Sequence, residues 1–145
     1  YASKICSYAQ GFALMRAAAA EFGWELEPGR IAMIWRGGCI IRAALLAHIR
    51  AAYKNQPELP HLLMDPYLGR EVAERQTDLR DMVCAAAELG VPAPGLMVSL
   101  AYFDAYRSAR LPANLTQAQR DYFGAHTYER LDRPGTFHTH WQEED

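Results

Sequence analysis

The spacing of apolar residues along the chain predicts a protein built almost entirely of helices. Residues 1–22, 65–89 and 94–110 are rich in Ala, Leu, Met, Arg and Glu, and their apolar positions repeat with a helical period. The sustained alternation that is typical of strands is nearly absent. Gly23 is placed to end the first helix, because glycine adopts the left-handed conformation of a C-terminal cap. We therefore expect an all-α fold.

Start and stop signals mark the helices in the second half of the chain. Asp65 followed by Pro66 predicts a helix start, because aspartate caps free N–H groups and proline fits the first helical position. That helix is amphipathic, and Gly90 with Pro92 should end it. The segment 94–110 is apolar nearly all round, which is typical of a central, buried helix.

The region before these helices is less regular. Residues 31–35 predict a helical turn or two, and helical spacing resumes over residues 39–53. Between them stands the run WRGG at residues 35–38. Arg36 could contact a ligand. The adjacent glycines allow either the close approach of another backbone, which is their most frequent role, or a sharp change in direction, with Trp35 filling space. The pattern therefore favours packing over ligand binding.

The last part of the chain combines one short helix with an irregular segment. Asn114 and Gln117 have the spacing of a capping box, which predicts a helix from 114 to about 123. After Gly124 the helical period is lost, and residues 133–135 read as a turn. The acidic residues at the very end are most simply a solvated terminus.

Length and composition indicate an ordinary globular domain. The 145 residues are 50% hydrophobic and 22% charged, which suits one domain with a real core. The formal net charge of −2 gives no basic surface that would point to nucleic acid or an anionic membrane. The longest uncharged run, residues 91–103, contains prolines and is too short to cross a bilayer.

The cysteines and the start of the chain bear on where it works. Cys6, Cys39 and Cys84 are far apart and odd in number, which favours buried free thiols in a reducing, cytoplasmic compartment. No basic-then-apolar leader is present, so no signal peptide is expected. A start at Tyr1, without methionine and inside an expected helix, suggests a fragment or a chain whose first residues were trimmed.

Motifs for nucleotide binding and nucleophilic catalysis are absent from the sequence. It contains no GxGxxG after a strand, no GxxxxGK[ST] loop and no GxSxG elbow. Five histidines invite a metal-binding interpretation, with His138 and His140 two residues apart. Zinc sites usually show a recognisable ligand pair on each side. The pattern therefore favours histidines that are hydrogen-bonded or exposed to solvent.

Arg120 and His126 are the more interesting pair. Arginine offers a planar, permanently charged fork that suits phosphate, and histidine can add a second donor. One residue lies on a helix and the other just past Gly124, so the two could converge on one anion. Spacing alone favours a simpler interpretation, with a solvated arginine and a capped core histidine.

Three long stretches of the sequence resemble the 6-phosphogluconate dehydrogenase family. They are YASKICSYAQGF at residues 1–12, WRGGCIIR at residues 35–42 and LPANLTQAQRDYFGAHTY at residues 111–128. The ending at residues 134–139, with PG followed by FHT, is also similar to that family's tail. Several long matches in the right order are far more specific than one short pattern.

The resemblance implies part of an oxidoreductase. Members of the family oxidise and decarboxylate 6-phosphogluconate to ribulose 5-phosphate in the pentose phosphate pathway, most of them with NADP. They combine an amino-terminal Rossmann domain, a large all-helical domain and a tail that reaches into the neighbouring subunit of a homodimer. The NADP site and the catalytic lysine and glutamate are expected upstream, so this chain alone should bind no coenzyme and be inactive.

The same resemblance implies a division of the chain and two substrate contacts. Residues 1–123 correspond to the later part of the all-helical dimerisation and substrate domain, and residues 124–145 to the tail. Arg120 and His126 match the arginine and histidine that bind the substrate in the partner subunit's active site, the arginine at its phosphate. This match favours a ligand role for the pair.

A second class of function stays open. A non-catalytic helical protein could keep the same dimer-forming fold and act as a binding or structural module. An upstream reading frame that contains GxGxxG after a strand, and the lysine base, would favour the enzyme. A frame that begins at Tyr1 would favour the module.

Overall fold

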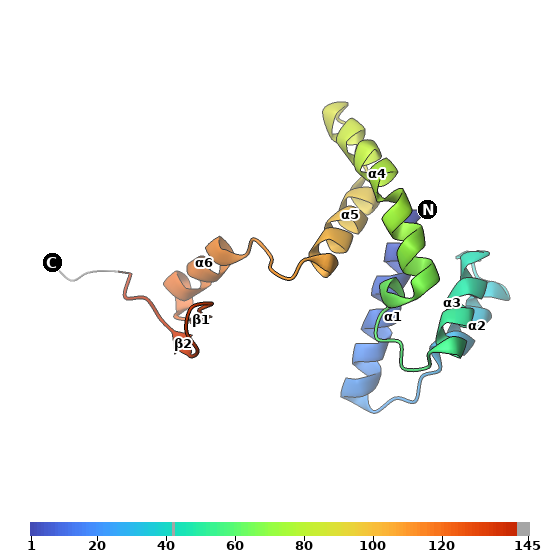
Figure 1. Ribbon diagram of the computed structural model, residues 1–145, viewed down its shortest axis with the longest axis horizontal. Coiled ribbons are helices and arrows are strands. Elements are labelled where there is room, and N and C mark those ends of the chain that lie inside the picture. Colours follow the sequence, from blue (N-terminus) through green and yellow to red (C-terminus); the bar gives the residue numbers. More distant parts are fainter. Residues whose placement is uncertain (42, 142–145) are drawn as a thin grey trace. The chain divides into compact units, whose positions relative to one another are not determined.

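The computed structural model describes residues 1–41 and 43–141, and over these residues the chain is mainly helical (Figure 1). Its elements are α1 (Ala2–Phe22), α2 (Pro28–Arg36), α3 (Leu45–Asn55), the 3-10 turn η1 (Leu62–Met64), α4 (Pro66–Glu88), α5 (Pro94–Arg107), α6 (Asn114–Gly124), β1 (Tyr128–Glu129) and β2 (Thr136–Phe137). The all-α prediction is confirmed, with one short hairpin added. Arg42, in the expected helix 39–53, and residues 142–145, in the expected tail, lie outside the described residues.

The chain folds as two compact units, residues 1–107 and residues 108–145. Two units replace the one ordinary domain expected from length, because residues 108–113 contain no helix and separate α5 from α6. The structure groups α6 with the residues after it, whereas the division at residue 123 kept it with the preceding helices. The roles given to those segments, a dimerisation domain and a tail that enters a partner, stay predictions.

An apolar core holds the larger unit together. Its α1 packs against α4, α5 and η1, and α2 lies beside α3 (Figure 1). Phe12 of α1 is buried, with its ring centroid 5.3 Å from that of Trp35 in α2 and 5.5 Å from that of Tyr53 in α3. These ring contacts link α1 to both α2 and α3. The prediction that Trp35 fills space is therefore confirmed.

Helix ends in the larger unit follow the predicted signals. The Asp65 carboxylate accepts hydrogen bonds from the Tyr67 and Leu68 N–H groups at 3.1 and 2.9 Å, next to Pro66 at the first helical position. Gly23 caps α1 with a φ of 66°, a conformation that side chains with a Cβ disfavour. The helix starts and ends named from single residues are therefore confirmed here.

The region around the two adjacent glycines differs from the prediction. Helix α2 already begins at Pro28, and α3 begins at Leu45, so residues 39–41, 43 and 44 are not helical. A Cβ added at Gly38 would meet no atom within 4 Å. A Cβ added at Gly37 would meet only the carbonyl oxygens of Ile34 and Met33, at 3.5 and 3.8 Å, within α2 itself. Neither glycine is therefore closely approached by a separate backbone segment among the described residues, and the alternative, a change of direction, agrees with the turn at residues 37–38 that ends α2. Glycine disfavours helix through its backbone entropy, and the pair lies where the helical run is interrupted.

Two burial predictions fail in the larger unit. On α5, only Ser99 and Leu100 are buried, while Val98 is 60% exposed. The helix packs on α1 and α4 with one side, and the described residues leave its other side uncovered. Cys6 is buried as expected, but Cys39 is only partly buried and Cys84, on α4, is exposed. None of the described helices combines the length and apolar run needed to cross a bilayer.

Candidate functional site

The predicted site residues lie in the smaller unit, where α6 ends. The expected capping box is wrong, because α6 begins after Ala113 without a side-chain cap. The Gln117 side chain instead donates a hydrogen bond to the Thr127 carbonyl oxygen, beyond the other end of the helix. This bond attaches the chain that follows α6 to the helix itself.

Arg120 and His126 are placed on one face of this helix end. Arg120 precedes Gly124 by one helical turn, so both lie on the same face. The His126 ring lies over Gly124, since a Cβ atom at residue 124 would be only 2.8 Å from the ring Nε2. Both Arg120 and His126 are exposed, so the alternative of a core histidine is wrong. The structure thus places the His126 ring beside the helix turn that follows Arg120.

A tight backbone reversal carries His126. Its neighbours Ala125 and Thr127 have φ values of 48° and 64°, in the left-handed region that costs a non-glycine residue roughly 1–2 kcal/mol. The Ala125 N–H donates to the Asp121 carbonyl oxygen at 2.9 Å, and the His126 N–H donates to that of Arg120 at 3.4 Å. Other interactions must hold so unfavourable a turn in place.

Asp121 supplies those interactions, and sequence reasoning missed its role. The side chain is fully buried. Its Oδ1 accepts hydrogen bonds from the Thr127 N–H at 3.0 Å and from His138 Nδ1 at 2.9 Å. Its Oδ2 accepts from the Thr139 N–H and from Trp141 Nε1, both at 2.9 Å. One carboxylate therefore attaches two separate stretches of the following chain to α6, Thr127 and residues 138–141.

Hydrogen bonding keeps this buried carboxylate ionised. Removal from water raises the pKa of the Asp121 carboxyl. Hydrogen bonds from Thr139, His138 and Trp141 outweigh that effect and lower the pKa to about 2. Because the carboxylate only accepts, His138 carries its proton on Nδ1. Asp121 is thus negatively charged at neutral pH.

A short hairpin replaces the irregular segment expected after Gly124. Strands β1 and β2 are antiparallel, with Tyr128 opposite Phe137 and Glu129 opposite Thr136. The expected turn at residues 133–135 lies in their connection. The Tyr128 hydroxyl also lies 2.7 Å from Oγ1 of Thr139, next to the N–H that donates to Asp121. The hairpin therefore leads the chain back to α6.

The two histidines considered as metal ligands have another arrangement. His138 is hydrogen-bonded to Asp121, and its ring centroid is 5.3 Å from that of His140. Within residues 1–41 and 43–141, no group of three His, Cys, Asp or Glu side chains is placed to hold a metal ion. His138 thus acts as a hydrogen-bonded histidine.

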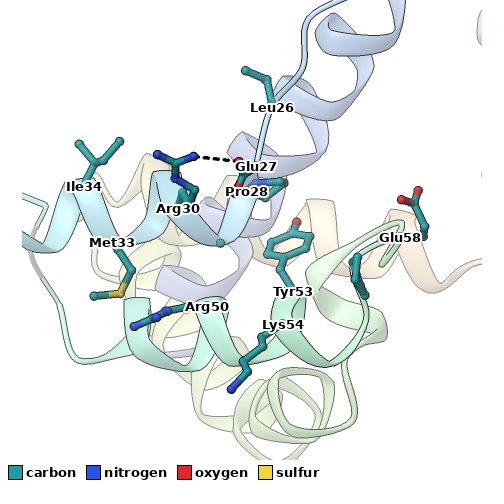
Figure 2. Close-up of a pocket in the computed structure, with 12 residues that line it drawn as sticks. Leu26, Glu27, Pro28, Arg30, Met33, Ile34, Arg50, Tyr53, Lys54 and Glu58 are labelled. Atoms are coloured by element: carbon teal, nitrogen blue, oxygen red, sulfur yellow. Dashed lines mark hydrogen bonds and ion pairs between the residues drawn. The ribbon is translucent and has the colours of Figure 1, made fainter.

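A cavity of about 820 Å³ lies in the larger unit and contains neither predicted site residue. Figure 2 shows Arg30 of α2 joined to Glu27, with Arg50 and Lys54 on α3. Arg30 Nη1 lies 2.9 Å from Glu27 Oε1, and both side chains are exposed to solvent. Exposed pairs of this kind contribute little energy. The lining mixes charges of both signs and gives no preference for one class of ligand.

The comparisons with known proteins decide the family. The model of the 6-phosphogluconate dehydrogenase C-terminal domain matches residues 1–141. The chain belongs to this family. The resemblance found in the three sequence stretches is therefore confirmed, and with it the link to an oxidoreductase family.

Curated relatives of the family are about 60% identical to this chain over the part of their sequence that it matches. The chloroplastic decarboxylating 6-phosphogluconate dehydrogenase 2 of Spinacia oleracea is 59% identical over 97% of this chain and 26% of its own length. The decarboxylating enzyme of Staphylococcus aureus (strain N315) is 60% identical over 99% of this chain and 31% of its own. The chain thus spans about a third or less of these relatives.

A solved relative has the same fold over nearly the whole chain. It is the 6-phosphogluconate dehydrogenase of Plasmodium falciparum, described in its apo form and in complexes with its cofactor NADP+ and its substrate 6-phosphogluconate. Its sequence is 48% identical, and its TM-score is 0.89 over 97% of this chain and 30% of the solved one. NADP+ is therefore a cofactor within the family.

Proposed function

We propose that this chain is the carboxy-terminal part of a decarboxylating, NADP-dependent 6-phosphogluconate dehydrogenase, and that Arg120 and His126 bind the substrate phosphate. In this proposal the enzyme is a cytoplasmic homodimer. Residues 1–123 contribute to the dimer interface, and residues 124–145 reach into the partner's active site. The coenzyme site and the catalytic acid and base belong to a part of the protein upstream of Tyr1.

The observation that carries the proposal is the placement of His126. Its ring lies over Gly124, on the helix face that also carries Arg120 one turn earlier. A guanidinium offers two parallel N–H donors to a phosphate, and an imidazole adds one more. Both side chains are exposed, as a site completed by a second subunit requires.

Such contacts serve catalysis without touching the reacting carbons. The phosphate of 6-phosphogluconate is remote from the carbon that is oxidised and from the carboxylate that is lost. Binding energy gained at the phosphate can hold the rest of the substrate in a reactive position. Arg120 and His126 therefore act as binding residues, and their loss should affect KM more than kcat.

Exposed apolar side chains support a larger assembly. Ile40 is 101% and Val98 60% exposed in the larger unit, and Phe123 is 81% exposed in the smaller one. Large apolar side chains are more often covered than this, either by the same chain or by other protein. The described residues thus leave apolar surface that the remainder of an enzyme, or a second subunit, would cover.

The test is a chimera in which this chain replaces the matching part of the Staphylococcus aureus relative. NADPH formation from 6-phosphogluconate is measured. Charged hydrogen bonds contribute about 1.5–3 kcal/mol each, so Arg120→Ala should raise KM about 10- to 100-fold. Arg50→Ala, in the cavity of Figure 2, is the matched control and should leave KM unchanged. A silent Arg120→Ala variant would contradict the phosphate contact.

Two further outcomes separate the enzyme from a non-catalytic module. NADPH formation by the purified 145-residue chain alone would contradict the upstream location of the catalytic sites. A chimera that folds, dimerises and binds NADP, but turns over no substrate, would favour the non-catalytic module. The same measurement of NADPH formation, made on the chain alone and on the chimera, tests both points.

A further inference from the structure

Asp121 and Arg120 are adjacent on α6 but face opposite environments. Successive residues of an α-helix are about 100° apart around its axis. The Asp121 side chain is fully buried, while Arg120 is exposed. A change in the contacts of Asp121 therefore acts on the backbone next to Arg120, whose guanidinium is proposed to hold the substrate phosphate.

The same residue holds the chain on both sides of His126. Its carbonyl oxygen accepts the Ala125 N–H at 2.9 Å, and its Oδ1 accepts the Thr127 N–H at 3.0 Å. Ala125 and Thr127 are the two residues in left-handed conformation. Without the carboxylate, the Thr127 N–H would lose its acceptor, and the strained turn would be free to relax. The His126 ring would then leave its place over Gly124.

We propose that Asp121 is a positioning residue, which fixes His126 over Gly124 and so preorganises the two phosphate contacts. This inference rests on the proposed function of Arg120 and His126. Asp121 itself touches no substrate. Its effect is to remove the conformational cost that a mobile His126 would meet on binding.

The remaining donors explain why this carboxylate is rigid. His138, Thr139 and Trp141 satisfy the acceptor positions that Thr127 leaves open. A fully satisfied buried polar group has one strongly preferred geometry, because any movement leaves donors or acceptors unpaired. The end of the hairpin and Trp141 thus contribute to the phosphate contacts through Asp121, although they lie 17 to 20 residues further along the chain.

The first test is Asp121→Asn in the chimera. Asparagine keeps the shape of the side chain, but its NH₂ group would face N–H donors. We expect KM for 6-phosphogluconate to rise about tenfold, with a smaller change in kcat. Asp132→Asn is the matched control, since Asp132 is an exposed carboxylate of the same unit, paired with Arg130. That control should leave KM unchanged.

A double-mutant cycle separates positioning from general destabilisation. In a His126→Ala background, Asp121→Asn should raise KM by less than about twofold, because the residue through which it acts is gone. A merely structural role would give the same factor in both backgrounds. Additive effects would therefore overturn the proposal.

A rescue experiment avoids dependence on one variant. His138→Ala should raise KM, and His138→Asn should restore it, because an asparagine N–H can replace the donor at Nδ1. Trp141→Phe removes the Nε1 donor and keeps the ring, and it should raise KM as well. If Asp121→Asn fails to fold, these variants decide the question. An unchanged KM in both His138→Ala and Trp141→Phe would overturn the positioning role of Asp121.

The two proposals fail in different ways. If Arg120→Ala and His126→Ala leave KM unchanged, the proposed function itself is wrong. If those variants raise KM while a folded Asp121→Asn enzyme keeps the normal KM, only the positioning role is wrong. A cooperative thermal unfolding transition, monitored by circular dichroism, establishes for each variant that it is folded.

Discussion

The two units of the chain bury opposite kinds of side chain at their centres. In the larger unit the buried residues are almost all apolar, and Phe12, Ile5 and Leu46 are among the largest. Among the described residues of the smaller unit, 108–141, the fully buried side chain is the Asp121 carboxylate, while Leu115 and Phe123 are 73% and 81% exposed. Small units cannot bury much apolar surface. Directional hydrogen bonds supply order there, and they also orient particular atoms.

The largest expected effect comes from deleting an aromatic ring in the apolar core. Phe12→Ala should destabilise the larger unit by about 3–5 kcal/mol, the usual cost of removing a buried phenylalanine. Urea unfolding followed by circular dichroism measures it. Leu14→Ala, at a 71% exposed position of the same helix, is the control. A loss below about 1 kcal/mol would contradict the role given to Phe12.

The next effect is local order in the smaller unit. Asp121→Asn should increase hydrogen exchange of the Thr127 and Thr139 amides about tenfold or more, because each loses an anionic acceptor. Amides in α1 should be unaffected. If the amides of α1 also exchange faster, the stability of the larger unit depends on the contacts of the smaller one.

Different pH ranges should weaken the two units. In the larger unit, His61 is buried, its Nδ1 accepts the Leu63 N–H at 3.1 Å, and its Nε2 lies 2.6 Å from the Tyr102 hydroxyl. Burial lowers the pKa of His61 below its ordinary value of 6.5. The unfolded chain therefore takes up the proton first, and stability falls as the pH drops below about 6.5.

Asp121 responds at lower pH. Its pKa falls from an ordinary 3.8 to about 2, so the stability it contributes is complete above pH 3.8 and lost as the pH drops toward 2. Hydrogen exchange across this range should show the larger unit weakening first. His61→Gln should remove that first change and leave the second. One shared transition for both units would contradict the assignment.

The smallest effect is expected from truncation of an exposed phenylalanine, Phe123. Phe123→Ala removes the same ring as Phe12→Ala, but from a position that is 81% exposed. We expect a change in stability within about 0.5 kcal/mol, as for most surface substitutions. The comparison of the two variants, measured by the same urea unfolding, tests directly whether apolar burial matters in the smaller unit.

Much of the larger unit could be predicted from apolar periodicity and single-residue signals. Gly23, Asp65 and Pro94 mark helix ends correctly, because their backbone conformations or capping bonds are local. The non-helical residues 39–41, 43 and 44 were missed, because their apolar spacing is compatible with a helix. The exposed side of α5 was missed because periodicity reports which surface is apolar, and only packing decides which surface is covered.

The candidate site was less accessible to sequence reasoning. Arg120 and His126 were assigned to the site from the family resemblance. Their spacing alone favoured a solvated arginine and a core histidine with no shared ligand. Asp121 gave no signal, because two of its four donors are main-chain N–H groups, which every residue type except proline carries. The side chains of His138 and Trp141 were the available hints, and they lie 17 and 20 residues away. Long-range polar contacts of this kind have no sequence period.

The distance along the chain between Asp121 and its donors has a consequence for synthesis. Synthesis runs from α6 toward Trp141, which lies 20 residues after the carboxylate, so Asp121 is made before Thr139 and Trp141. Until Thr139 and Trp141 have both been made, the carboxylate lacks at least one of its four donors. A premature stop codon just before Thr139 would yield a polypeptide that retains the arginine and the imidazole but lacks the late contacts that order them.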